Sequence, residues 1–186
     1  MDYNEVLETA RTKIGTKCKA CPICNGVACR NTMPGPGAKG IGDTAIRNYQ
    51  KWQEIRVNMD TIHENKPIDT SVELFGRTFK YPFFAGPVGA VQLHYGDCLN
   101  DISYNDILVS ACAASGIAAF TGDGTDSNVM VAATKAIKNA GGLGIPTVKP
   151  WNIEVIREKM AMVKDSGAFA VAMDIDAACL LYTSPS

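Results

Sequence analysis

The stretch that decides the fold runs from residue 117 to residue 173 and reads IAAFTGDGTDSNVMVAATKAIKNAGGLGIPTVKPWNIEVIREKMAMVKDSGAFAVAM. Short apolar runs at 117–120, 145–148 and 169–173 alternate in it with amphipathic segments at about 126–140 and 152–166. Apolar residues at every third or fourth position indicate helices, and short apolar runs between turn residues indicate strands. Because strands separated by a helix pair in parallel, this order predicts an α/β fold with a parallel sheet.

The same alternation begins before the quoted stretch. An apolar run at 83–85 and a helical segment at about 100–115 add one strand and one helix to it. Before these, two short extended runs on either side of Gly76 predict a hairpin over 71–82. The sequence therefore predicts four parallel strands preceded by a hairpin.

The number of strands bounds the architecture. A closed eight-stranded α/β barrel takes about 250 residues, whereas this chain has 186 and supplies four strands. An open doubly wound sheet is the other arrangement, but no covering helix follows the fourth strand, so we expect a barrel truncated after about four strands. Residues 179–186 resemble a translated sequencing adaptor, and we expect this tail to be foreign. The expected domains are an N-terminal segment over 1–42, a barrel half over 43–178 and the tail over 179–186.

The N-terminal segment is distinguished by its cysteines. A helix is expected over 2–14, and a second one starts at the N-cap residue Asp43. Between them, residues 15–42 are rich in Cys, Gly and Pro and predict an irregular loop. Four of the chain's seven cysteines lie here, with ferredoxin-like spacing that also suits tetrahedral zinc. We interpret Cys18, Cys21, Cys24 and Cys29 as candidate ligands of an iron–sulfur cluster or zinc, with free or redox-active thiols as the alternative.

Composition excludes several classes of protein. The chain is 46% hydrophobic and 20% charged with a formal net charge of -1, which fits a globular domain and excludes disorder, collagen and coiled coil. A nearly balanced charge offers no field that attracts nucleic acid or an anionic membrane. The sequence has no apolar run of the roughly 18 residues that cross a bilayer, and no signal peptide at its start. We therefore expect a cytoplasmic protein without nucleic-acid or membrane partners.

The candidate site follows from what comes after each predicted strand, because ligands of α/β folds bind beyond the carboxyl ends of the parallel strands. Small, polar or glycine residues stand at 85–90, 121–124, 149–150 and 174–176. Glycines on either side of a proline in the first segment let backbone amides approach a flat ring closely, which suits a flavin or a nucleotide. Lys149 can balance the negative charge of a phosphate or of a reduced flavin.

The order of these motifs resembles a known family. A glycine-rich segment at 34–42, a helix with Asn48, the hairpin residues 73–77 and the segment 82–89 are similar to the FMN-dependent α-hydroxy-acid dehydrogenase/oxidase family, which includes glycolate and lactate oxidases. The resemblance covers residues 34–178. It implies a (β/α)₈ barrel that holds FMN at the carboxyl ends of its strands and oxidises a small 2-hydroxy acid to a 2-oxo acid.

The resemblance also implies roles for single residues. The turn Pro87–Gly89 matches the backbone that lies against the isoalloxazine, and Gly122 matches a flavin-contacting residue. Asp174 matches the carboxylate that orients the catalytic histidine, with Asp176 as the rival candidate. The expected cofactor-binding residues are Gly86, Pro87, Val88, Gly89, Thr121, Gly122 and Lys149, and the expected catalytic residue is Asp174.

The chain departs from the family pattern in ways that limit these expectations. The family's basic histidine, substrate-binding arginine and flavin-facing lysine come from later strands, so we expect the chain by itself to be inactive. We also expect its full-length parent to form a homo-oligomer. The substrate-binding tyrosines are not evident either. Two alternatives stay open: another FMN barrel, such as a type 2 isopentenyl diphosphate isomerase, and a cysteine-based metal or electron-transfer module.

Overall fold

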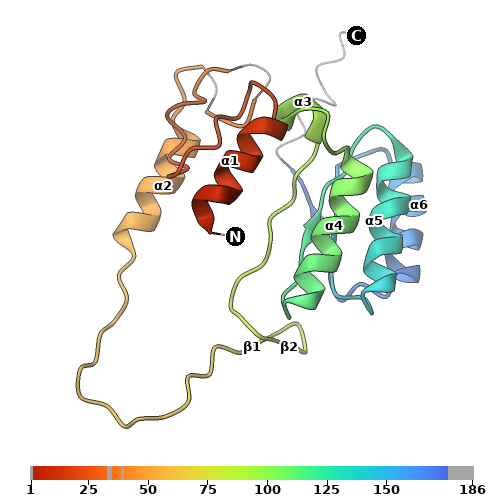
Figure 1. Cartoon of the computed structure of the whole chain (residues 1–186). Coiled ribbons are helices and arrows are strands. Elements are labelled where there is room, and N and C mark those ends of the chain that lie inside the picture. Colours follow the sequence, from red (N-terminus) through yellow and green to blue (C-terminus); the bar gives the residue numbers. More distant parts are fainter. Residues whose placement is uncertain (1, 33–34, 39, 176–186) are drawn as a thin grey trace. The chain divides into compact units, whose positions relative to one another are not determined.

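The computed structural model describes residues 2–32, 35–38 and 40–175, drawn in colour in Figure 1. The rival aspartate at 176 and the tail at 179–186 lie outside the described residues. The chain forms two compact units, one of Met1–Ile68 with Val91–Leu99 and the other of Asp69–Ala90 with Asn100–Ser186. Within the described ranges, no helix combines the length and the apolar character that crossing a bilayer requires.

The first unit is helical and irregular. It contains α1 (Tyr3–Lys13), α2 (Thr44–Glu54) and the short α3 (Val91–Tyr95). Helix α1 begins at Asp2, whose side chain accepts from the Glu5 amide while Glu5 reaches back to Asp2, and this reciprocal cap fixes the start of the helix. The described residues between α1 and α2 form turns and bends only, as the Cys, Gly and Pro content predicts.

The second unit opens with the predicted hairpin. Strands β1 (Val72–Leu74) and β2 (Arg77–Phe79) pair antiparallel. Both residues of the connecting turn, Phe75 and Gly76, have positive φ, at 52° and 71°. This is the geometry that matches the twist of a two-residue hairpin. The hairpin is anchored by Phe79, which is 1% exposed and packs edge-on against Phe84.

A parallel sheet forms the centre of the second unit. It consists of β3 (Phe120–Thr121), β4 (Ile145–Val148) and β5 (Ala172–Met173) in the order β3-β4-β5. A parallel bridge between Ala85 and Ala119 pairs the predicted first strand, at 83–85, with the residues just before β3. The four predicted strands therefore pair in chain order, which confirms the predicted parallel α/β fold. The described residues contain no closed barrel.

Three helices connect and cover these strands. They are α4 (Asp101–Ala114), α5 (Ser127–Asn139) and α6 (Ile153–Asp165), and Figure 1 shows them side by side. Each begins at a side-chain cap, from Asn100, Asp126 and Asn152 respectively, so all three start within a residue or two of the predicted positions. Helix α5 packs against both neighbours. The main core cluster lies between helices and sheet and consists of Val109, Cys112, Ile117, Ala119, Ala136 and Ile137.

Candidate functional site

The carboxyl ends of the strands meet at one edge of the sheet, as the sequence predicts. The first link joins the turn after Ala85 to the end of β3. A Cβ atom added to Gly122 would lie closer than 3.0 Å to the Val88 carbonyl oxygen and 3.3 Å from the Gly89 Cα. Only glycine at 122 allows the two backbones this close approach.

Two polar links continue from β3 to β4 and β5. The backbone N–H of Lys149 donates to Asp123 Oδ2 at 3.0 Å, which joins the ends of β3 and β4. The ammonium group of Lys149 then donates to Asp174 Oδ2 at 3.1 Å, which joins β4 to β5. This second pair is partly exposed, with side-chain exposures of 22% and 31%. The structure therefore brings Val88, Gly89, Gly122, Lys149 and Asp174 together, and their roles stay predictions.

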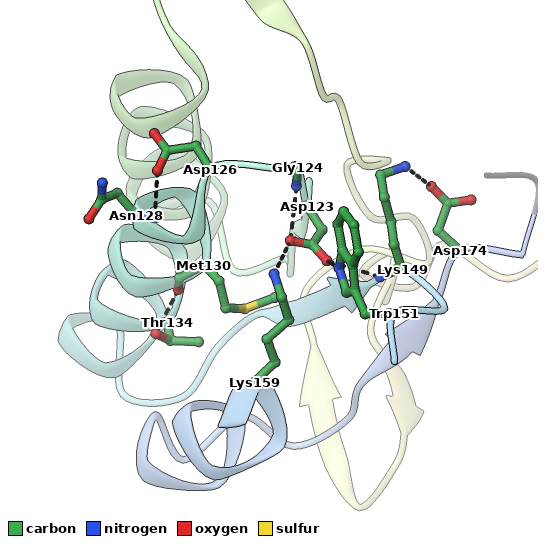
Figure 2. A network of polar contacts seen from close by, with 10 residues as sticks. All are labelled: Asp123, Gly124, Asp126, Asn128, Met130, Thr134, Lys149, Trp151, Lys159 and Asp174. Atoms are coloured by element: carbon green, nitrogen blue, oxygen red, sulfur yellow. Dashed lines mark hydrogen bonds and ion pairs between the residues drawn. The ribbon is translucent and has the colours of Figure 1, made fainter. Parts of the chain in front are cut away.

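Asp123 lies at the centre of a polar network that the sequence did not reveal (Figure 2). Its carboxylate accepts from Lys159 Nζ at 2.6 Å, from Trp151 Nε1 at 2.7 Å and from the Gly124 amide at 2.9 Å, in addition to the Lys149 amide. The side chain of Asp123 is 0% exposed and that of Lys159 is 7% exposed. Removing one partner of such a buried ion pair costs about 3–5 kcal/mol, because the other charge stays buried without compensation.

A second residue that the sequence did not reveal, Asn105, supports the end of β3 from helix α4. Asn105 on α4 is fully buried, and its Oδ1 accepts from the Gly122 amide at 3.3 Å. Its Nδ2, like the hydroxyl of the neighbouring Thr121, is buried without a hydrogen-bond partner. Buried polar atoms without partners are rare in folded proteins. The Gly122 backbone is therefore held by a hydrogen bond to α4. Next to this strand end, Asn105 Nδ2 and the Thr121 hydroxyl are buried without hydrogen-bond partners.

The arrangement suits a planar, negatively charged cofactor. Space is open above Gly86 and Gly124, where an added Cβ would meet no atom within 4 Å. Gly86 and Pro87 are exposed, so the backbone of the first turn is accessible to a ligand. Lys149, at the end of β4, contributes an ammonium group at the same edge of the sheet, and Asp174 takes one of its three N–H donors. Glycine backbone with a cation at a nearby strand end fits the ring and the charge of a flavin nucleotide.

The described part of the second unit is a parallel α/β fold whose strands follow chain order and end in glycine and charged residues at one edge of the sheet. A family model described as FMN-dependent dehydrogenase matches residues 36–183. The chain belongs to this family, and it is an FMN-binding oxidoreductase domain. The family implies a (β/α)₈ barrel, of which the structure describes strands in parallel succession. No curated protein matches the sequence.

The predicted metal ligands lie in the other unit, and the structure does not arrange them as a site. Among residues 2–32, 35–38 and 40–175, no three His, Cys, Asp or Glu side chains are placed to hold a metal ion. Cys24 is exposed, and Cys18, Cys21 and Cys29 are half-buried. Partial burial raises the pKa of Cys24, and the nearby thiols of the other three raise it further. The four cysteines therefore share a neighbourhood, and metal binding stays a prediction.

The predicted role of Asp174 also stays a prediction. Its carboxylate accepts from Lys149, whereas the family role that its position suggests is to orient a histidine. Both histidines of the chain, His63 and His94, belong to the first unit. Trp151 packs against the core cluster of Met130, Val148 and Val163 and also donates a hydrogen bond to Asp123.

Proposed function

We propose that this domain is part of an enzyme that oxidises a small 2-hydroxy acid, of the lactate or glycolate type, to the 2-oxo acid with FMN as cofactor. The observation that carries the proposal is the convergence of Gly122, Gly89 and Lys149 at one sheet edge in a member of the FMN-dependent dehydrogenase family. When bound, FMN supplies the two-electron acceptor that side chains lack. Substrate class itself is inferred from the resemblance of the motifs.

The chain's own residues contribute binding and orientation. Gly86, Gly89 and Gly122 offer backbone without side chains against which a ring can lie. The ammonium group of Lys149 would attract negative charge at the same face, because partial shielding from solvent strengthens its field. The ion pair with Asp174 fixes its position and offsets part of its charge. Asp174 thereby keeps Lys149 at the face. These residues would be responsible for holding and charge-balancing the cofactor.

Anaerobic spectroscopy tests the proposal. Lactate or glycolate, added without oxygen to an FMN-loaded full-length protein that carries this domain together with the family's histidine and arginine, should bleach the visible flavin absorption as two electrons leave the substrate. Absence of bleaching by any small 2-hydroxy acid would reject the substrate class. Matched additions of 2-oxo acids serve as controls, because they bind the same kind of site and carry no electrons to give.

The alternative is another FMN barrel, such as a type 2 isopentenyl diphosphate isomerase. The observation that favours it is the cation at Lys149, which suits a phosphate as well as a carboxylate. Bleaching by a reduced nicotinamide and not by 2-hydroxy acids would support this alternative and contradict the first proposal.

A further inference from the structure

The carboxylate of Asp123 is fully engaged, which limits what it can do. An ionised carboxylate has about four lone-pair sites and no proton to donate. Four donors occupy its two oxygens: the ammonium group of Lys159 and the amide of Gly124 on Oδ1, and the amide of Lys149 and the indole of Trp151 on Oδ2. No acceptor site is left for a substrate proton or a ligand. The role of Asp123 is therefore positional.

The donors come from three parts of the second unit. Gly124 follows β3, Lys149 and Trp151 follow β4, and Lys159 lies within α6 (Figure 2). Lys159 also stands 5.4 Å from the centroid of the Trp151 ring, which adds a cation–π contact to the hydrogen bonds. The Asp123 network, meaning Asp123 and these four residues, thus fastens two strand ends to one helix.

Lys149 is the member of the network that reaches the strand-end face. Its backbone is fixed by the buried Asp123, and its side chain is directed to the partly exposed Asp174. Rotation of the Lys149 backbone would break the bond to Asp123 Oδ2 and move the ammonium group away from Asp174. The position of the partly exposed Lys149 ammonium group therefore depends on the buried Asp123–Lys159 ion pair.

We propose that Asp123, held by Lys159, is a positioning residue for the cofactor: it fixes the backbone at Lys149 so that the Lys149 ammonium group stays at the strand-end face and meets negative charge on FMN. The inference rests on the proposed FMN site. The negative charge that Lys149 meets lies either on the flavin ring or on the ribityl phosphate. Riboflavin has the ring and no phosphate, so comparing its binding with that of FMN shows which of the two is the partner.

The test is a double-mutant cycle on FMN affinity, measured by quenching of flavin fluorescence. Asp123→Asn and Lys149→Gln should each weaken FMN binding at least about tenfold, and the double variant should be no more than about twofold weaker than the weaker single variant. An unchanged affinity in Asp123→Asn, or effects that multiply in the double variant, would overturn the inference. If Lys149→Gln weakens FMN but not riboflavin, the phosphate is the partner, and an equal loss for both identifies the ring.

A second variant and a second readout extend the test, and the far-UV circular dichroism spectrum of each variant shows that it is folded, because removing Lys159 leaves the Asp123 charge buried. Lys159→Met removes the ammonium group and keeps the aliphatic stem, and Lys138→Met is its matched control, because the Lys138–Asp165 pair is exposed at 58% and 75%. The chain has two tryptophans, so ¹⁵N-indole labelling gives two NMR signals. Trp52 is 71% exposed and serves as the internal reference for hydrogen exchange.

We expect slow exchange of the Trp151 indole N–H in the wild type and in Lys138→Met. In Lys159→Met, faster exchange and weaker FMN binding should appear together. Faster exchange with unchanged FMN affinity would overturn the inference, because the network would then be open with no effect on the cofactor. A wild-type protein that binds no FMN would instead reject the proposed function, so the two failures are distinguishable.

Discussion

Replacing Gly122 with alanine tests the close approach that builds the candidate site. The added Cβ would lie closer than 3.0 Å to the Val88 carbonyl oxygen, at 3.0 Å from its carbonyl carbon and at 3.3 Å from Gly89 Cα. All three are backbone atoms that cannot rotate away, so the end of β3 and the turn 86–89 must separate. Overpacking of this kind costs about 1–3 kcal/mol, and it also disturbs the two backbone segments expected to hold the flavin.

The matched control is Gly124→Ala, two residues further along the same loop. An added Cβ at Gly124 meets no atom within 4 Å, and its φ lies outside the positive range. Urea unfolding should therefore show a lower midpoint for Gly122→Ala and a change within about 0.5 kcal/mol for Gly124→Ala. FMN titration should show weaker binding for Gly122→Ala than for the wild type. Equal urea midpoints of Gly122→Ala and Gly124→Ala would refute the reasoning.

Three further predictions concern other parts of the chain. Gly76→Ala should lower the free energy of unfolding by about 1 kcal/mol, because Gly76 has φ of 71° and open space around it; a urea midpoint equal to that of Gly124→Ala would contradict the turn geometry. Burial raises the pKa of both Tyr104 and Cys112, so on raising the pH the unfolded chain loses these protons before the folded chain does, and the free energy of unfolding should fall above about pH 9. Urea midpoints measured from pH 7.5 to 10.5 should fall less steeply with pH in Tyr104→Phe than in the wild type. The same dependence on pH in both proteins would contradict the role of Tyr104. Anaerobic purification followed by iron and zinc analysis should find stoichiometric metal that Cys21→Ser/Cys24→Ser loses while keeping its FMN, and metal-free protein would remove the prediction for the four cysteines.

The sequence predicted the fold well where periodicity was strong. Helices α4, α5 and α6 and strand β4 occur where the apolar pattern places them, because each buries one face or one short run against the same core. The short α3 and the late start of β3 at Phe120 were not predicted. Five residues carry too little periodicity to mark a helix, and 117–119 pair partly through an isolated bridge instead of a continuous ladder.

The sequence predicted where the candidate site lies, but not the buried residues that hold it in place. Glycines and polar residues after each strand identified the face, since the carboxyl ends of parallel strands share one edge. Asp123, Lys159 and Asn105 were missed because their partners lie 17 to 36 residues away in sequence. One signal was present: Lys159 shares the buried face of α6 with Val163, and a lysine on a core-facing stripe needs a buried acid.

Hydrogen–deuterium exchange with and without FMN tests the central claim, that the strand ends of the second unit hold the cofactor. The account predicts that FMN slows exchange in peptides covering 85–90, 121–124 and 147–151, where the glycine backbone and Lys149 face the ligand. Peptides from helices α4, α5 and α6 should exchange at the same rate with and without FMN. Protection confined to residues 2–32, or no protection at the strand ends at saturating FMN, would contradict the account.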